Sequence, residues 1–151
     1  MPAFPELFTS RFGARKLIVE SGLVPVRISI GHPKWPLGYK VSYSCPLLFP
    51  TATMLRMDEE EYIHHYMRQL DGTGAVAIGA SLRRISDRCS GRGLVLLCFE
   101  DLAKQGEWCH RQMFASWWET ETGRKVPELG EVAGKVKVRQ ESLFPEKATA
   151  L

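Results

Sequence analysis

The chain has 151 residues, of which 44% are hydrophobic and 25% are charged, and its formal net charge is +3. This length suits one domain, and about two-thirds of the surface of its unfolded form can be buried on folding. The composition is too apolar for a disordered chain, and the 20 basic residues are spread along the sequence rather than gathered into a nucleic-acid-binding tail. The longest apolar stretch, Gly93 to Phe99, falls far short of the ~20 residues of a membrane-spanning helix.

The cysteines bear on the compartment and on folding. Four cysteines allow two disulfides, but the sequence opens with neither the basic nor the apolar segment of an export signal. We therefore expect reduced thiols and a cytoplasmic protein that has no membrane partner. A chain of this size does not need a metal or a disulfide in order to fold, and no cofactor is expected.

The first part of the chain alternates regular segments with a long irregular one. A serine and a glycine bracket a helix predicted over Arg11 to Ser21. Apolar and β-branched residues predict a strand over Leu23 to Ile30, with Pro25 near its beginning, where a strand tolerates proline. The next segment, Gly31 to Pro50, holds four prolines and two glycines. It predicts a long loop, and such loops in small domains are often functional.

The second part predicts three helices and one buried strand. Asp58 begins an Asp-x-x-Glu capping pattern, and a helix is predicted from Glu59 to about Leu70. Apolar residues at helical spacing predict another helix over Ala75 to Arg88. The continuous apolar run Gly93 to Phe99 predicts a central strand covered on both faces. An amphipathic helix is predicted from Glu107 to about Thr120.

Strands that alternate with helices predict one compact α/β domain, with a parallel or mixed sheet and helices on both faces. We place this domain at residues 1–126. Residues 127–151 are interpreted as a C-terminal extension, in which the alternating pattern from Lys135 to Arg139 indicates an edge strand or a tail. Sheets of this kind bind ligands at the carboxyl ends of their strands, which selects two segments of the chain.

The first segment follows the strand predicted over Leu23 to Ile30. It carries Arg27 on the strand and His32 and Lys34 in the loop. These three are ligand-binding candidates, because cationic side chains hold phosphates and carboxylates. The alternative is a plain connecting loop whose Trp35 and Tyr39 pack on the core.

The second segment joins the end of the central strand to the start of the last helix. Cys98 and Glu100 end the strand, and Cys109, His110 and Arg111 begin the helix. Unpaired N–H groups and the helix dipole favour anions there, so they would lower the pKa of Cys109, and Arg111 would bind a phosphate or carboxylate. Glu100 would act as a general base, and His110 would move a proton near neutral pH. The catalytic candidates are therefore Glu100, His110 and Cys109, and the ligand-binding candidates are Cys98 and Arg111.

Structural roles compete with these assignments. A cysteine at the end of an apolar run, such as Cys98, is more often a small buried hydrophobe than a reactive group. Glu100 and Arg111 would then form an ion pair between strand and helix.

Zinc is the competing chemistry. Its candidate ligands are Cys89, Cys98, Cys109 and His110. Structural zinc sites usually contain closely paired ligands, whereas these cysteines are widely separated. In addition, the adjacent Cys109 and His110 are expected to reach one ion only rarely. No metal site is therefore expected.

Two short runs carry a family resemblance. Leu96 to Asp101, followed by Trp108 to Arg111, resembles the "LLC-x-E … CHR" signature of the family known as domain of unknown function 488. The order of elements over Phe8 to Val126 is also similar to that family. The resemblance implies a compact α/β domain with Rossmann-like layering and a pocket near the Cys-His-Arg run. It points to Cys98, Glu100, Cys109, His110 and Arg111 as site residues. It also implies a role for Arg27, which corresponds to the arginine of an Asp-Val-Arg strand in many members. In this chain Pro25 replaces the aspartate of that strand.

The leading hypothesis is a domain that binds an anionic or phosphorylated ligand, such as a nucleotide or a nucleic-acid base, with hydrolase or transferase chemistry as an extension. Arg27, Lys34 and Arg111 would hold the anion. The alternative is a non-catalytic module whose loop from His32 to Phe49 contacts a protein or nucleic acid. Both an enzyme and a binding module remain open at this point.

Overall fold

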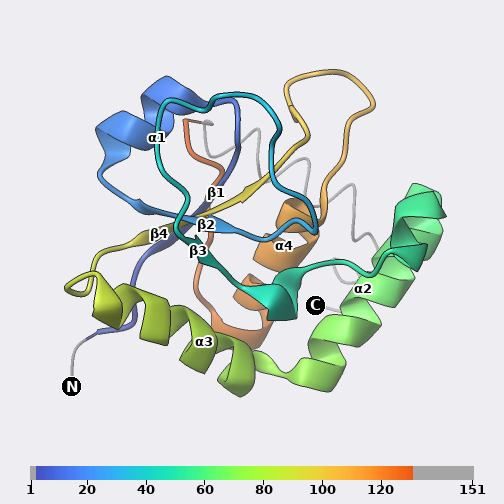
Figure 1. Ribbon diagram of the computed structural model, residues 1–151. Coiled ribbons are helices and arrows are strands. Elements are labelled where there is room, and N and C mark those ends of the chain that lie inside the picture. The colour runs from blue at the N-terminus through green and yellow to red at the C-terminus, as the bar shows by residue number, and fades with distance from the viewer. Residues whose placement is uncertain (1–2, 131–151) are drawn as a thin grey trace.

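The computed structural model describes residues 3–130 and has a mixed α/β architecture. Its four parallel strands lie in the order β1-β4-β2-β3. The strands are β1 (Leu7–Arg11), β2 (Val24–Arg27), β3 (Tyr43–Ser44) and β4 (Leu94–Cys98). The helices are α1 (Arg15–Ser21), α2 (Glu59–Thr73), α3 (Ala75–Arg88) and α4 (His110–Thr122), and two short 3₁₀ turns span Pro46–Leu48 and Thr53–Arg56 (Figure 1).

Strand β4 forms the middle of the sheet, as its continuous apolar sequence predicts. It pairs with β1 on one side and with β2 on the other, so that Leu96 lies between Thr9 and Val26. All five of its residues are buried. A strand that is covered on both faces can be apolar throughout, which explains the uninterrupted run.

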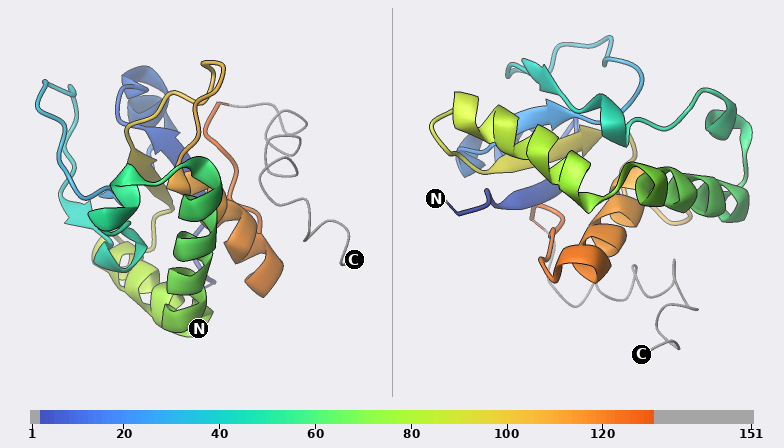
Figure 2. Two further views of the ribbon diagram at one scale, coloured as in Figure 1. Left: turned by 90° about the vertical axis from the view of Figure 1, so that its right-hand side faces the viewer. Right: turned by 90° about the horizontal axis from the view of Figure 1, so that it is seen from below.

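Helices cover both faces of the sheet, as predicted. Leu94 and Leu96 face a core shared with α2, α3 and α4, whereas Val95 and Leu97 face a smaller core that includes Ile18 of α1. Figure 1 shows α1 and α3 on opposite sides of the strands, and Figure 2 shows α2 beside both α3 and α4. Successive residues of a strand point to opposite faces, so one strand supplies both cores.

The helix predicted over Arg11 to Ser21 is wrong at its beginning. Leu7–Arg11 is strand β1, and helix α1 starts only at Arg15. Thr9 and Ser10 are buried by their neighbours rather than by their own hydrophobicity, because β1 pairs along its whole length with β4. The end of α1 is as predicted, since Gly22 closes it in the left-handed conformation at φ 70°.

Helices α2 and α3 follow the sequence prediction closely. The prediction for α3 is confirmed at both ends, and α2 continues to Thr73, slightly beyond the predicted end at Leu70. The Asp58 carboxylate accepts a hydrogen bond from the Glu61 backbone N–H at 2.9 Å, as the capping pattern predicts.

Loss of this cap should weaken the domain measurably. Asp58→Ala removes an acceptor from an otherwise unpaired N–H of the first turn, so we expect the free energy of unfolding to fall by about 1 kcal/mol. Urea denaturation followed by circular dichroism measures the change. Asp87→Ala, an exposed acid near the end of α3, is the matched control, and an equal loss in both variants would contradict the capping role.

The segment Gly31 to Pro50 is mostly irregular, as predicted, but it also supplies a short edge strand. Tyr43–Ser44 pairs with the end of β2, a contact that a two-residue element cannot signal in its own sequence. Tyr39 packs on the smaller core and donates a hydrogen bond from its hydroxyl to the Phe12 carbonyl at 2.6 Å. Trp35 is 48% exposed.

Helix α4 begins at His110 rather than at the predicted Glu107, with Cys109 as its extended N-cap. After α4 the chain returns to the sheet, where Leu129 donates a backbone hydrogen bond to the Thr9 carbonyl at 2.7 Å. The pattern from Lys135 to Arg139 lies outside the described residues. Within residues 3–130, no helix combines the length and the apolar character that crossing a membrane requires.

Candidate functional site

A pocket of about 390 Å³ lies beyond the carboxyl ends of β2 and β4. This is the location that the general rule for parallel sheets predicts. The pocket brings together four of the predicted site residues, which are Cys98, Glu100, Cys109 and His110. Its lining consists of residues 29–31, 98–100 and 107–110, together with Pro50, Leu55, Met57 and Tyr62.

The cationic residues predicted to bind a ligand do not line this pocket. Arg27 instead supports the turn after β2, where its Nη1 donates to the carbonyls of Ser29 and Ile30 at 2.5 and 2.7 Å. Its guanidinium also lies over the Phe49 ring, 4.7 Å from the centroid. His32 and Lys34 are exposed on the loop.

Arg111 has a structural role that its position at a helix start does not predict. The side chain is completely buried. Nε and Nη2 donate to the two carboxylate oxygens of Glu128 at 3.0 and 2.9 Å, and Nη1 donates to the Cys98 sulfur at 3.1 Å. Glu128 and Cys98 engage the guanidinium, and Arg111 does not line the pocket, so this arrangement does not present the side chain for the predicted anion contact.

Glu128 is the residue that the sequence analysis missed. It was assigned to the C-terminal extension, whereas the structure buries it beside β1, where it also accepts a hydrogen bond from the Thr9 hydroxyl at 2.8 Å. The structural alternative paired Arg111 with Glu100, whereas in the structure Arg111 forms its ion pair with Glu128. No local pattern identifies this partner, because only the return of the chain to β1 brings the two groups together.

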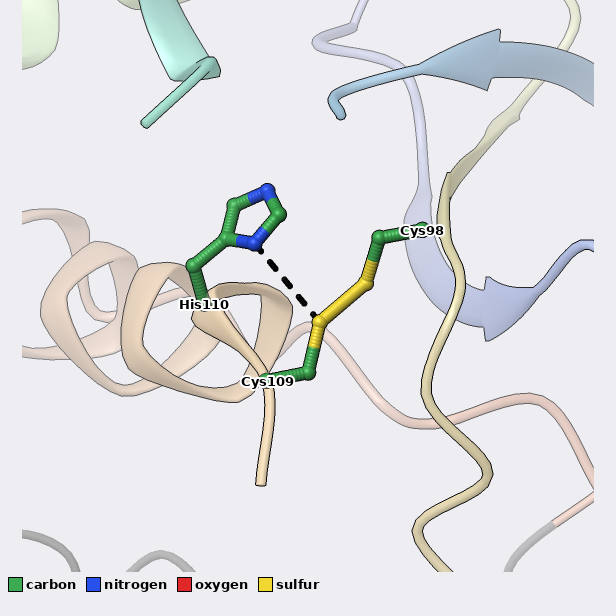
Figure 3. A group of neighbouring side chains, drawn as sticks. All are labelled: Cys98, Cys109 and His110. Carbon is green, nitrogen blue, oxygen red and sulfur yellow. Dashed lines mark hydrogen bonds between the residues drawn. A yellow bond between two sulfur atoms is a disulfide. The ribbon is translucent and has the colours of Figure 1, made fainter. Parts of the chain in front are cut away.

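Cys98 and Cys109 form a disulfide at the pocket wall (Figure 3). Their Cα atoms are 7.6 Å apart, and both side chains are buried. The expectation of reduced thiols is therefore wrong for this pair in the structure, while Cys45 and Cys89 are free. In the disulfide form, Cys109 carries no thiolate that could act as a nucleophile.

His110 lies against the disulfide and is held by the backbone at the end of β2. Its Nε2 is 2.8 Å from the Ile28 carbonyl, and its Nδ1 is 3.6 Å from the Cys109 sulfur (Figure 3). A carbonyl only accepts hydrogen bonds, so Nε2 carries the proton and Nδ1 presents its lone pair to the sulfur atoms.

The protonation of His110 also differs from the sequence expectation. Burial lowers the pKa of His110 to about 4. The hydrogen bond to Ile28 raises it and the Arg111 charge lowers it, and both of these effects are smaller than that of burial. The imidazole is therefore neutral at physiological pH. The sequence analysis predicted that His110 would exchange a proton near neutral pH, and a pKa of about 4 does not favour that role.

Glu100 is the partly buried carboxylate of the pocket. Burial raises the pKa of Glu100, while a backbone hydrogen bond and the Arg111 charge lower it. Glu107 lies on the same wall. No lysine or arginine occurs among the described residues of the lining, so the pocket has an acidic rather than a basic character.

Aromatic rings form much of the remaining wall. Tyr62 and Trp108 meet edge to face, with ring centroids 5.0 Å apart. Phe99 lies at the rim, 37% exposed, and its centroid is 5.9 Å from that of Trp35. Tyr62 is buried in the main core and also lines the pocket, a role that the sequence analysis did not identify. Burial and the charge of Glu100 raise the pKa of Tyr62, so its hydroxyl stays protonated.

The chain matches no protein-family model, no curated protein and no solved structure. Membership in the family known as domain of unknown function 488 therefore stays a prediction from the motif residues, and the site is interpreted from its own geometry.

Proposed function

We propose that the chain binds the planar, uncharged ring of a nitrogenous ligand, such as a nucleobase, in the pocket beyond β2 and β4. The observation that carries this proposal is the combination of aromatic walls with a partly buried carboxylate and no lysine or arginine in the described lining. As in the sequence hypothesis, the proposed ligand contains a nucleobase. In the present proposal, however, the pocket recognises the ring of the base rather than a phosphate. The layering, which we propose to be Rossmann-like, supports a ligand at this edge of the sheet.

The size and the walls of the pocket support a flat ligand. A volume of about 390 Å³ lies within the range of roughly 300–1,000 Å³ for small-molecule sites. Tyr62 and Trp108 offer ring surfaces, and enzymes and binding proteins that accept unpaired bases stack them on such side chains. Leu55 and Met57 add apolar contacts on another side.

The polar group that would select the ligand is Glu100. A carboxylate accepts hydrogen bonds from ring N–H and exocyclic amino groups, as acidic side chains do with the amino group of cytosine. A phosphate in the same place would meet the charges of Glu100 and Glu107 without a cation from the lining. The site therefore favours the base over the phosphate of a nucleotide.

Calorimetric titration of the four common ribonucleosides and their 5′-monophosphates tests the proposal. We expect at least one nucleoside to bind, and its monophosphate to bind with comparable affinity. Glu100→Gln should weaken that binding about 10- to 100-fold, because a hydrogen bond to a charged group contributes about 1.5–3 kcal/mol.

Asp101→Asn is the matched control for Glu100→Gln. Asp101 is the neighbouring acid, lies outside this pocket and pairs with Arg11 at 3.8 Å. Its replacement should leave nucleoside binding unchanged. The proposal fails if no nucleoside binds, or if only monophosphates bind with a strong salt dependence, since that result would indicate recognition of an anion.

One observation supports the alternative of a module that contacts nucleic acid through the loop from His32 to Phe49. The exposed Trp35 ring packs against Phe99 at the rim of the same pocket. An exposed aromatic pair is suited to stacking with single-stranded bases. A Trp35→Ala variant that loses oligonucleotide binding but retains nucleoside binding would support this second function.

A further inference from the structure

We propose that Cys98, Cys109 and His110 form a zinc-binding site in the reduced chain. Their sulfur and nitrogen atoms lie within 4.8 Å of one another, and all three side chains are buried. Two thiolates and an imidazole are ligands that zinc prefers in tetrahedral sites. The sequence analysis discounted zinc because the cysteines are widely separated in sequence and because adjacent Cys109 and His110 rarely reach one ion. The turn into α4 nevertheless brings the ligand atoms of Cys109 and His110 together.

The distance between these two adjacent ligands fits a shared ion. With Zn–N of about 2.0–2.1 Å and Zn–S of about 2.3 Å, tetrahedral geometry separates the nitrogen from the sulfur by about 3.6 Å. The observed separation of His110 Nδ1 from Cys109 Sγ is 3.6 Å. This pair can therefore bind one ion with little rearrangement.

The orientation of His110 is that of a metal ligand. Metal-binding histidines usually donate their second ring N–H to a carbonyl or carboxylate, which fixes the tautomer and aims the other nitrogen at the ion. Here Nε2 donates to the Ile28 carbonyl at 2.8 Å, so the lone pair of Nδ1 is directed at the sulfur atoms. A disulfide has no proton to offer this lone pair, whereas a zinc ion would satisfy it.

Arg111 supplies the outer partner for the other cysteine. Its Nη1 lies 3.1 Å from the Cys98 sulfur, and a charge-assisted hydrogen bond favours a thiolate there. The charge of Arg111 is itself balanced by Glu128. Two thiolates would balance the charge of Zn²⁺, so the whole buried group would be neutral.

The separation of the two cysteine backbones also suits an ion. Their Cα atoms are 7.6 Å apart, whereas disulfides usually span about 4.4–6.8 Å. Two thiolates on one tetrahedral zinc lie about 3.8 Å apart, which is wider than a disulfide bond. Rotation about the Cα–Cβ bonds would provide this spacing.

The zinc form and the disulfide form are alternative states of the same pair. Zinc binding to the reduced chain replaces two thiol protons, which pass to solvent, and involves no electron transfer. Where the pair is oxidised, a phosphine reductant supplies two electrons and becomes the phosphine oxide, while water supplies its oxygen and the two thiol protons.

The site has the form of a catalytic rather than a structural zinc centre. It has three protein ligands, and structural sites normally have four. Cys98, Cys109 and His110 all line the pocket that also contains Glu100. The fourth position would therefore face the pocket, where a water molecule or the ligand would complete the coordination.

Zinc titration of the full chain, reduced with a phosphine and stripped of metal, tests the site without any organic ligand. We expect one equivalent of zinc per chain in competition with a chromophoric chelator. With Co²⁺ as the probe, we expect the visible bands of a tetrahedral ion and a thiolate-to-cobalt charge-transfer band. Absence of stoichiometric zinc, or of the thiolate band, would overturn the proposal.

Variants assign the ligands. Cys98→Ser, Cys109→Ser and His110→Gln should each weaken zinc binding by at least roughly 100-fold, the upper end of what the loss of an outer-shell partner costs. Cys89→Ser and His65→Gln, which change a free cysteine and an exposed histidine elsewhere, should have no effect. Unchanged zinc affinity in Cys98→Ser or Cys109→Ser would contradict the assignment. If those variants do not fold, the cobalt spectrum of the unaltered chain decides.

The zinc site and the proposed base site fail separately. Nucleoside binding is measured on metal-free protein and depends on Glu100, whereas zinc binding is measured without nucleoside and depends on the cysteines and His110. A chain that binds nucleosides but no zinc would refute only the present inference, and a chain that binds zinc but no nucleoside would refute only the proposed function.

Discussion

Glu128→Gln is expected to lower the free energy of unfolding by about 3–5 kcal/mol, because it leaves the positive charge of Arg111 buried without its counterion. Arg111 is fully buried, and two of its nitrogens bind the Glu128 carboxylate. Water cannot solvate the guanidinium in place of the lost carboxylate charge. Urea denaturation at neutral pH, followed by circular dichroism, measures the loss.

A double variant separates the charge from the packing. Arg111→Met with Glu128→Leu removes both charges, and buried ion pairs replaced by apolar side chains often retain stability. We expect the double variant to be more stable than Glu128→Gln alone. Glu121→Gln, an exposed acid in α4, controls for the loss of one surface charge. Equal stability of Glu128→Gln and Glu121→Gln would show that the buried pair is not coupled as the structure indicates.

Trp117→Ala is expected to destabilise the domain by about 3–5 kcal/mol, as large-to-small changes of buried aromatic residues do. Trp117 is fully buried where α4 packs against α2, and its Nε1 donates to the Asp71 carboxylate at 2.8 Å. The substitution removes the ring contacts with Phe114 and Trp118 as well as this hydrogen bond.

Trp35→Ala is the matched control for Trp117→Ala, since it removes the same atoms from a side chain that is 48% exposed. We expect a change within about 0.5 kcal/mol, the usual range for a surface position. Circular dichroism is the suitable signal, because both variants alter the tryptophan fluorescence. If the two variants lose the same stability, the core assignment of Trp117 is wrong.

Elements with a strong internal pattern could be predicted from the sequence. Helix α2 shows its cap at Asp58 and its apolar stripe, α3 repeats its apolar positions over 14 residues, and β4 is apolar throughout. Strands β1 and β3 were missed for a physical reason. Thr9 and Ser10 are buried only because β4 lies beside them, and Tyr43–Ser44 is a strand only because it pairs with β2.

The sequence predicted most of the polar residues of the site but not the contacts that these residues make. The motif identified Cys98, Glu100, Cys109 and His110, and the structure brings all four to one pocket. What each side chain contacts depends on segments distant in sequence. Arg111 meets Glu128 only because the chain returns to β1, and the partner of His110 is a backbone carbonyl, which leaves no trace in the residue types.

The contacts made by the first turn of α4 imply that inserting one residue within this turn would disturb the fold more than inserting one in the loop before it. Its N-cap and first two residues project toward three separate parts of the molecule, with Cys109 toward β4, His110 toward the end of β2 and Arg111 toward Glu128. One residue inserted among them would rotate the following side chains by about 100°, since a helix has about 3.6 residues per turn. All later contacts would then point in the wrong directions. An insertion at exposed Gln105 or Gly106, in the loop before α4, would leave that phase unchanged. We therefore expect the fold to tolerate an added residue in this loop but not within residues 109–111.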